Sequence, residues 1–261
     1  MAIISFALPD LVVVSGTSSG LGESLCKVLL DQDVIVIGVD IAPSSIGESQ
    51  GYRHVKGSVS DISTWNSVLK IIETIKPRRI GLVTSAAILD TGTVPKITPE
   101  SVYRAMNVNV TGTALGMAAL IPIMETMGGG TIVAVASVNA SLAEQQLAVY
   151  NASKAAVRQL ARTAALDHAP KGVRINVLSP GPMMAGLFKR HLESATDSSK
   201  FLSTRARRQP QGKILDARDV AHAVTFLLSD GACAILGADL IADGGLTAGF
   251  DFRTGAEGAS V

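Results

Sequence analysis

The sequence predicts an α/β fold in which a single doubly wound parallel sheet of about seven strands carries helices on both faces. Three observations lead to this prediction. Short apolar runs alternate with stretches of helical spacing from Leu11 to Ala242. A glycine-rich turn, Ser15 to Gly22, joins the first apolar run to the first helical stretch. The chain has 261 residues, 47% of them hydrophobic, which suits one large α/β domain spanning residues 1–261.

The elements follow one another with short connections. Strands are expected at 11–14, 34–40, 52–56 (an edge strand), 80–84, 132–136, 173–178 and 238–242. Helices are expected at 23–33, 62–75 (capped by Asp61 and closed by Pro77), from Pro99 through 124, around Tyr150 as far as Asp167, and at 217–229. Asn107 and Asn109 inside an apolar helix are costly unless bonded, so each is expected to tie down a neighbouring loop.

Composition excludes several classes of partner. The net charge is +1 and only 17% of residues are charged, which argues against nucleic acid and anionic membranes. The first eight residues lack the basic start of a signal peptide, and Pro122 interrupts the most apolar helical stretch. Cys26 and Cys233 are interpreted as buried thiols without metal-ligand spacing. A cytoplasmic protein with no metal is the resulting expectation.

The glycine-rich turn predicts an anion site. Gly16, Gly20 and Gly22 let the backbone turn tightly and approach a pyrophosphate at the start of a helix, where unpaired N–H groups favour an anion. Strand, glycine turn, helix and strand together form half of a Rossmann-type dinucleotide-binding unit.

Asp40 bears on the choice of cofactor. It closes the second strand, about 20 residues after the turn, where a carboxylate accepts hydrogen bonds from the adenosine ribose. It would repel a 2′-phosphate, and no lysine or arginine stands nearby in sequence to hold one. NAD is therefore favoured over NADP, with a simple loop-capping role for Asp40 as the alternative.

Three side chains, a hydroxyl, a phenol and an amine, suggest a site that transfers a proton. Tyr150 and Lys154 are four residues apart and share one helix face, so the ammonium is expected to lower the phenol pKa. Ser137 follows a buried strand and can point into a cleft. Taken alone, the tyrosine–lysine pair also occurs on exposed helix faces.

Together these features resemble the short-chain dehydrogenase/reductase family, from Leu11 to Gly245. The matching stretches are SGTSSGLG at 15–22, Asp40, VNVTG around Asn109, ASV at Ser137, YNASK from Tyr150 to Lys154, SPG at 179–181 and DGG at 243–245. The resemblance implies that Tyr150 exchanges the proton, Lys154 lowers its pKa and holds the nicotinamide ribose, Ser137 bonds the substrate oxygen, and Asn109 holds a water.

The resemblance also implies a set of cofactor contacts. They are Gly16, Ser19, Gly20, Leu21, Gly22, Asp40, Ile41, Ser58, Val59, Ser85, Ala86, Tyr150, Lys154, Pro180, Gly181 and Met183. The sequence departs from the family pattern at Thr84-Ser85-Ala86-Ala87, where Ala87 replaces a glycine, at Ser58 in place of an aspartate, and at Ala185 in place of a threonine.

The substrate pocket is expected between residues 137–147 and a mobile lid at 183–212. Its apolar candidates are Pro182, Met183, Met184, Leu187 and Phe188, and its polar ones are Asn139, Glu144, Gln145 and Gln146. The basic residues Lys189, Arg190, Arg205, Arg207 and Arg208 are interpreted as a solvated face, with an anion-binding arginine as the alternative. His191 is expected at the surface. The tail 249–261 either packs through Phe250 and Phe252 or is a disordered end.

The leading hypothesis is an NAD-dependent oxidoreductase that acts on a secondary alcohol or its ketone, in a sugar, polyol, steroid or cyclic alcohol. A 3-oxoacyl-carrier reductase and a non-catalytic dinucleotide-binding protein are the alternatives. The resemblance further implies a homo-oligomer, a dimer or a tetramer.

Overall fold

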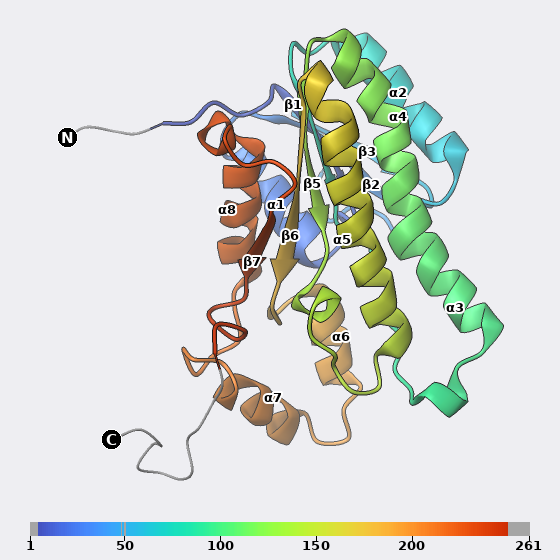
Figure 1. Cartoon of the computed structure of the whole chain (residues 1–261), viewed down its shortest axis with the longest axis vertical. Coiled ribbons are helices and arrows are strands. Elements are labelled where there is room, and N and C mark those ends of the chain that lie inside the picture. Colours follow the sequence, from blue (N-terminus) through green and yellow to red (C-terminus); the bar gives the residue numbers. More distant parts are fainter. Residues whose placement is uncertain (1–4, 48, 50, 250–261) are drawn as a thin grey trace.

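A seven-stranded parallel sheet forms the centre of the computed structural model, which describes residues 5–47, 49 and 51–249 (Figure 1). The strand order is β3-β2-β1-β4-β5-β6-β7. The strands are β1 (Leu11–Ser15), β2 (Ile35–Asp40), β3 (Tyr52–Lys56), β4 (Ile80–Thr84), β5 (Gly130–Val135), β6 (Val173–Pro180) and β7 (Asp239–Ala242). The predicted fold class is confirmed, and β3 lies at one edge as expected.

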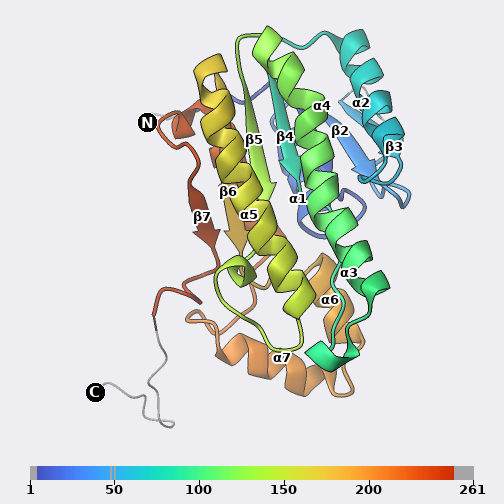
Figure 2. The same ribbon diagram turned by 45° about the vertical axis from the view of Figure 1, so that its right-hand side comes forward.

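Helices cover both faces of the sheet (Figures 1 and 2). One face carries α1 (Gly20–Leu30) and α8 (Ala217–Leu228), and the other carries α2 (Ile62–Ile75), α4 (Gly112–Thr126) and α5 (Ala148–His168). The central strands β1 and β4 are buried along their whole length and are mostly apolar, because both of their faces are covered. Two hydrophobic cores result, one on each side of the sheet.

The strand order determines where along the sheet a ligand can bind. β1 pairs with both β2 and β4, so the chain leaves β1 toward one edge of the sheet and returns to fill the other. The connections therefore diverge beyond the carboxyl ends of β1 and β4 and leave a crevice between them, which is where open α/β sheets bind ligands.

Pro122 does not interrupt its helix, contrary to expectation. Helix α3 (Pro99–Met106) continues through a π-helical turn, Asn107–Thr111, into α4, and Pro122 lies inside α4. The continuous helix, Pro99–Thr126, is long and apolar enough to cross a membrane by length and composition alone. Its buried face packs on the sheet and on Trp65 of α2, as in the core helix of a globular domain.

The segment 183–212, the lid segment from here on, contains two helices that the sequence analysis did not predict. They are α6 (Gly186–Glu193) and α7 (Ser198–Arg207). Both are short and rich in polar residues, and neither has a fully buried residue, so they lack the apolar stretch by which core helices are recognised. Short 3-10 turns occupy Val94–Lys96, Val138–Ala140, Ala169–Lys171 and Asp230–Ala232.

Two further expectations concern residues outside the sheet. Cys26 is buried as predicted, but Cys233 is exposed, because it follows a 3-10 turn instead of lying in an apolar helix. The tail 249–261, with Phe250 and Phe252, lies outside the described residues except for Gly249.

Candidate active site

A cavity of about 1190 Å³ runs along the carboxyl edge of the sheet, from Asp40 at one end to the lid segment at the other. It collects nearly all of the predicted site residues. They are Gly16, Ser19, Gly20, Leu21, Asp40, Ile41, Ser58, Val59, Ser85, Ala86, Ser137, Tyr150, Lys154, Pro180, Gly181 and Met183. Gly22 and Asn109 are the two that do not line it.

The glycine turn is built by close backbone approaches. Gly16 has φ +78°, and a Cβ there would lie 2.7 Å from the Cα of Ala86. The Ser15 hydroxyl accepts hydrogen bonds from the N–H groups of Ser85 (3.1 Å) and Ala86 (3.2 Å), which fixes the ends of β1 and β4 together. Gly22 is required for close packing of the turn and does not contact the cavity. A Cβ at this position would lie 2.2 Å from the Gly16 carbonyl oxygen.

The amino terminus of α1 faces the cavity without a side-chain cap. Ser19 occupies the N-cap position, but its hydroxyl makes no capping hydrogen bond. Nearby, the Asp40 carboxylate accepts from the N–H groups of Ser18 (3.0 Å) and Ala42 (2.9 Å). The turn therefore presents N–H donors where a pyrophosphate would lie, and a fixed carboxylate where a ribose would lie. These residues fit a dinucleotide.

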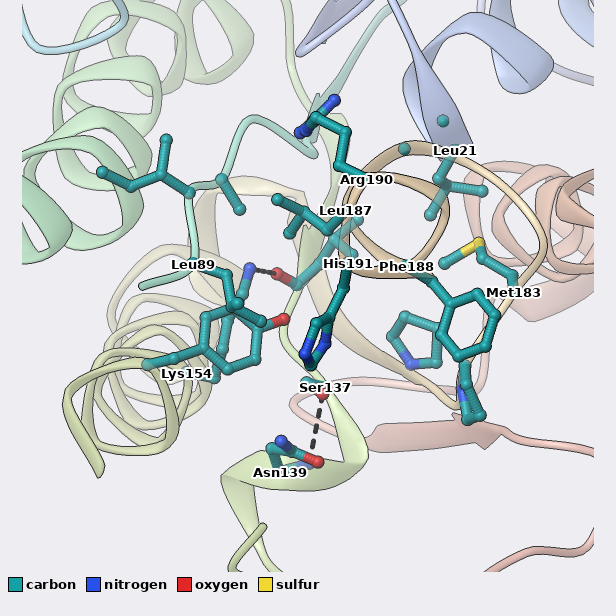
Figure 3. Close-up of a pocket in the computed structure, with 18 of the residues that line it drawn as sticks. Leu21, Leu89, Ser137, Asn139, Lys154, Met183, Leu187, Phe188, Arg190 and His191 are labelled. Carbon is teal, nitrogen blue, oxygen red and sulfur yellow. Dashed lines mark hydrogen bonds between the residues drawn. The ribbon is translucent and has the colours of Figure 1, made fainter. Parts of the chain in front are cut away.

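Ser137, Tyr150 and Lys154 meet at the middle of the cavity. Ser137 is buried at the end of β5, and its hydroxyl hydrogen-bonds the Tyr150 phenol. The buried Lys154 Nζ donates to the Val135 carbonyl (2.8 Å) and lies 5.9 Å from the centre of the Tyr150 ring. Figure 3 shows both Lys154 and Ser137 at this point. The predicted arrangement of one face of α5 against the end of β5 is therefore present.

The pKa values differ from the sequence-based expectation. Burial raises the pKa of Tyr150 to about 12; the hydrogen bond with Ser137 opposes this rise and the charge of Glu144 adds to it. Burial lowers the pKa of Lys154 to about 8. The prediction that Lys154 makes the phenol acidic is thus wrong in this structure, because the water-poor site disfavours the charged forms of both groups.

Asn109 lies behind the cavity, in the π-helical turn. Its side-chain oxygen accepts from the Ile88 N–H (2.8 Å), and its amide nitrogen donates to the Ile88 carbonyl (3.0 Å) and to the Ser153 hydroxyl (2.9 Å). Ser153 directly precedes Lys154 on α5. As predicted, Asn109 ties down a neighbouring loop, whereas Asn107 is exposed.

The lid segment forms the far wall of the cavity. His191 lines it and packs against Phe201, with the two rings tilted by 57° and their centroids 4.9 Å apart, and its ring points toward Ser137 in Figure 3. The expectation of a surface histidine is therefore wrong. Pro182, Met183, Leu187 and Phe188 also line the cavity as predicted, while Met184 is exposed and does not.

Of the basic residues named in the sequence analysis, Arg190, Arg205 and Arg208 line the cavity, and Arg190 and Arg208 are at the same time exposed, as expected for a solvated face. Arg205 forms an ion pair with Glu144 (2.5 Å), which joins α7 to the loop after β5. The sequence analysis missed Phe201 and Gln209 as lining residues. Gln209 is buried, and its side-chain oxygen has no hydrogen-bond partner among the described residues, a property that only the packed structure reveals.

A polar network holds the loop after β5. The Asn139 amide donates to Glu144 (3.2 Å) and to the Asn151 side-chain oxygen (3.1 Å), and the Asn151 amide donates to the Glu144 carbonyl (3.1 Å). Since Asn151 adjoins Tyr150, this network fixes the loop relative to the phenol.

Known proteins share both the sequence and this architecture. A family model described as enoyl-(acyl carrier protein) reductase matches residues 16–247. The chain is 30% identical to 2-(S)-hydroxypropyl-CoM dehydrogenase 3 of Xanthobacter autotrophicus, over 92% of this chain and 97% of that protein. It is 29% identical to cis-4-hydroxycyclohexanecarboxylate dehydrogenase of Sinomonas cyclohexanicum, over 90% and 96% of the two chains. The ligand-free aldohexose dehydrogenase of Thermoplasma acidophilum superposes with a TM-score of 0.88 at 28% identity, covering 96% of this chain and all of that one.

The chain belongs to the short-chain dehydrogenase/reductase family, a family of oxidoreductases that bind a nicotinamide dinucleotide. The resemblance found in the sequence is thereby confirmed.

Proposed function

We propose that this protein is an NAD-dependent dehydrogenase that interconverts a secondary alcohol and its ketone. The observation that carries the proposal is the meeting of Ser137, Tyr150 and Lys154 in the same cavity as the glycine turn and Asp40. Proton exchange and dinucleotide binding are thus supported within one continuous space.

Each of the three central residues has a role in this proposal. In alcohol oxidation the Tyr150 oxygen takes the hydroxyl proton, and in ketone reduction the phenol returns it. The Ser137 hydroxyl donates to the substrate oxygen and stabilises the charge that grows there. Lys154 holds the nicotinamide ribose and supplies positive charge beside the phenol when protonated. A nicotinamide dinucleotide along the glycine turn supplies the hydride acceptor or donor.

Asp40 supports NAD over NADP. Two backbone N–H groups fix its carboxylate at the ribose end of the cavity, where it can accept from both hydroxyls of an unmodified ribose. A 2′-phosphate would meet this negative charge directly.

A cyclic or otherwise compact carbon body suits the substrate end, which combines the rings of Phe188, Phe201 and His191 with aliphatic side chains. The names of two relatives include a hydroxycyclohexanecarboxylate and a hydroxypropyl-CoM. Reduction of a 3-oxoacyl carrier substrate is the second candidate, supported by the description of the matching family model.

The test follows nicotinamide absorbance with NAD and with NADP over a panel of secondary alcohols and ketones, including a 3-oxoacyl thioester. The expected result is turnover of at least one alcohol with NAD. Tyr150→Phe is expected to reduce turnover by about 10²–10⁴-fold while leaving NAD binding intact, since general acid–base catalysis contributes that much. Tight NAD binding without turnover of any compound would instead support a non-catalytic dinucleotide-binding protein.

The proposal includes a homo-oligomer in the cytoplasm, a dimer or a tetramer. Helix α4 has a single charged residue, Glu125, and the outward faces of α3, α4 and α5 expose apolar residues such as Tyr103, Ala118 and Leu166. In Figure 2, α4 and α5 lie side by side and offer one continuous face to a second copy. The free thiols of Cys26 and Cys233 suit a reducing compartment.

A further inference from the structure

Helix α6 of the lid segment sits directly on the glycine turn. A Cβ on Gly186, the first residue of α6, would lie 3.1 Å from the Gly20 Cα, and a Cβ on Gly20 would lie 3.1 Å from the Gly186 Cα. Both residues have positive φ, +50° and +67°. Two glycines therefore let the lid helix and the first turn of α1 approach closely, and any side chain at either position would push them apart.

This approach brings a cation to the amino terminus of α1. Arg190, one turn along α6, lines the cavity, and its guanidinium donates to the Ser19 hydroxyl over 3.4 Å. Arg205 of α7 is neutralised by Glu144. Arg190, in contrast, forms no ion pair with any carboxylate in the part of the chain that the structure describes.

Two positive features therefore face the same point of the cavity. The first turn of α1 has no side-chain cap, so its N–H groups and the positive end of the helix dipole remain open to an anion. The guanidinium of Arg190 approaches the same N-cap residue from the opposite wall. Ser19 is a neutral partner for a group that prefers the bidentate geometry of phosphate.

We propose that Arg190 binds the pyrophosphate of the dinucleotide and so closes the lid segment over it; this rests on the proposed function. The pyrophosphate, with its two negative charges, would lie between the N–H groups of α1 and the guanidinium. The ribose 2′ position is the less suitable target for this cation, since the Asp40 carboxylate and its two N–H donors already occupy that end.

The same contact would shape the substrate wall. Arg190 and His191 are consecutive on α6 and leave the helix in opposite directions in Figure 3, with His191 pointing toward Ser137. A pyrophosphate that holds Arg190 therefore also holds His191 over the reacting centre. Cofactor binding and the completion of the substrate pocket become one event.

The experiment compares ligands that differ in phosphate content. The whole protein is titrated calorimetrically with ADP-ribose, 2′-AMP and adenosine, and adenosine is measured by competition against ADP-ribose. The titrations are carried out on the parent and on three variants, Arg190→Gln, Arg190→Lys and Lys189→Gln. Lys189→Gln is the matched control: it removes the same charge from the adjacent exposed position, which does not line the cavity.

The proposal expects Arg190→Gln to weaken ADP-ribose binding by about tenfold, the scale of one charge-assisted hydrogen bond, and Arg190→Lys to recover part of the loss. Adenosine binding stays unchanged, and Lys189→Gln behaves like the parent. Unchanged ADP-ribose affinity in Arg190→Gln overturns the proposal, as does an equal loss for adenosine and ADP-ribose. A loss confined to 2′-AMP would assign the arginine to a 2′-phosphate and also overturns it. If the parent binds no ADP-ribose, it is the proposed function that fails.

Discussion

At the scale of single residues, burial in the cavity disfavours the charged forms of Lys154 and Tyr150. Lys154 is buried, and its Nζ donates to the backbone carbonyl of Val135. Tyr150 stays protonated up to high pH because burial raises its pKa to about 12. The protein without cofactor is thus set with a neutral phenol, the form that donates a proton in ketone reduction.

Lys154 gives a stability prediction. Its pKa falls from 10.5 to about 8 on folding, so between these values the unfolded chain binds more protons than the folded protein. Lys154 should therefore add about 2–3 kcal/mol to the free energy of unfolding between pH 8 and 10, a gain that is lost as pH falls back to 8. The Cys26 thiol opposes this rise above pH 9, because burial raises its pKa from 9.0 to about 12, and the Tyr150 phenol opposes it from about pH 10 upward. The contribution of Lys154 is therefore the difference between the parent and Lys154→Met.

Urea denaturation at pH 7.5 to 10 measures this effect. Lys154→Met should abolish the rise, whereas Lys189→Met, which removes an exposed lysine from α6, should keep it. If the free energy of unfolding rose equally with pH in both variants, the lowered pKa of Lys154 would be contradicted.

Asp40 gives a specificity prediction. Replacing its carboxylate in Asp40→Ala removes both the acceptor for the ribose hydroxyls and the repulsion of a 2′-phosphate. The ratio of kcat/KM with NAD to that with NADP should fall by about tenfold or more, the scale of a lost charge-assisted hydrogen bond. Asp31→Ala, at an exposed acid on the far end of α1, is the control; an unchanged ratio in Asp40→Ala would remove the reason for choosing NAD.

At the scale of elements, the π-helical turn joins three parts of the site. Asn107–Thr111 adds one wide turn between α3 and α4, and this turn directs Asn109 at the Ile88 backbone and at Ser153 on α5. π-turns of this kind are rare and often mark functional sites. The turn thus fixes the loop after β4 relative to the helix that carries Tyr150 and Lys154.

Asn109→Ala should be strongly destabilising. It leaves the Ile88 N–H and carbonyl without their partner, at a cost of about 1–3 kcal/mol for each group that stays buried. The unfolding midpoint in urea measures the loss. Asn107→Ala, two residues away in the same turn but exposed, should change it by less than about 0.5 kcal/mol, and an equal effect of both variants would argue against a specific role.

At the scale of the whole molecule, the outward face of α4 and α5 predicts the assembly. Leu166 on α5 is 71% exposed, and the neighbouring helix α4 carries one charged residue, Glu125. Leu166→Glu should shift the protein toward smaller species in sedimentation analysis, because a buried carboxylate without a partner is costly at an interface. Ile62→Glu on α2, where the side chain is 65% exposed, is the matched control and should leave the assembly unchanged. A parent that sediments as a monomer would refute the oligomer.

The sequence by itself determined the alternation of strands and helices, the glycine turn with Asp40, and the positions of Ser137, Tyr150 and Lys154. These follow from signals that are local in the chain: buried strands read as apolar runs, and residues four apart share a helix face. The lid helices escaped prediction because they are short and mostly polar, with no buried residue to give an apolar stretch.

Only the tertiary structure decided what depends on contacts between distant segments. The pKa directions of Tyr150 and Lys154 follow from burial, which no spacing of residues reveals. The contact of Arg190 with Ser19 and the position of His191 in the cavity wall depend on how the lid segment crosses the glycine turn, about 170 residues away in sequence. The chemical groups of a site can be identified from residues that are neighbours in the sequence, whereas its electrostatic environment depends on all the segments that pack around it.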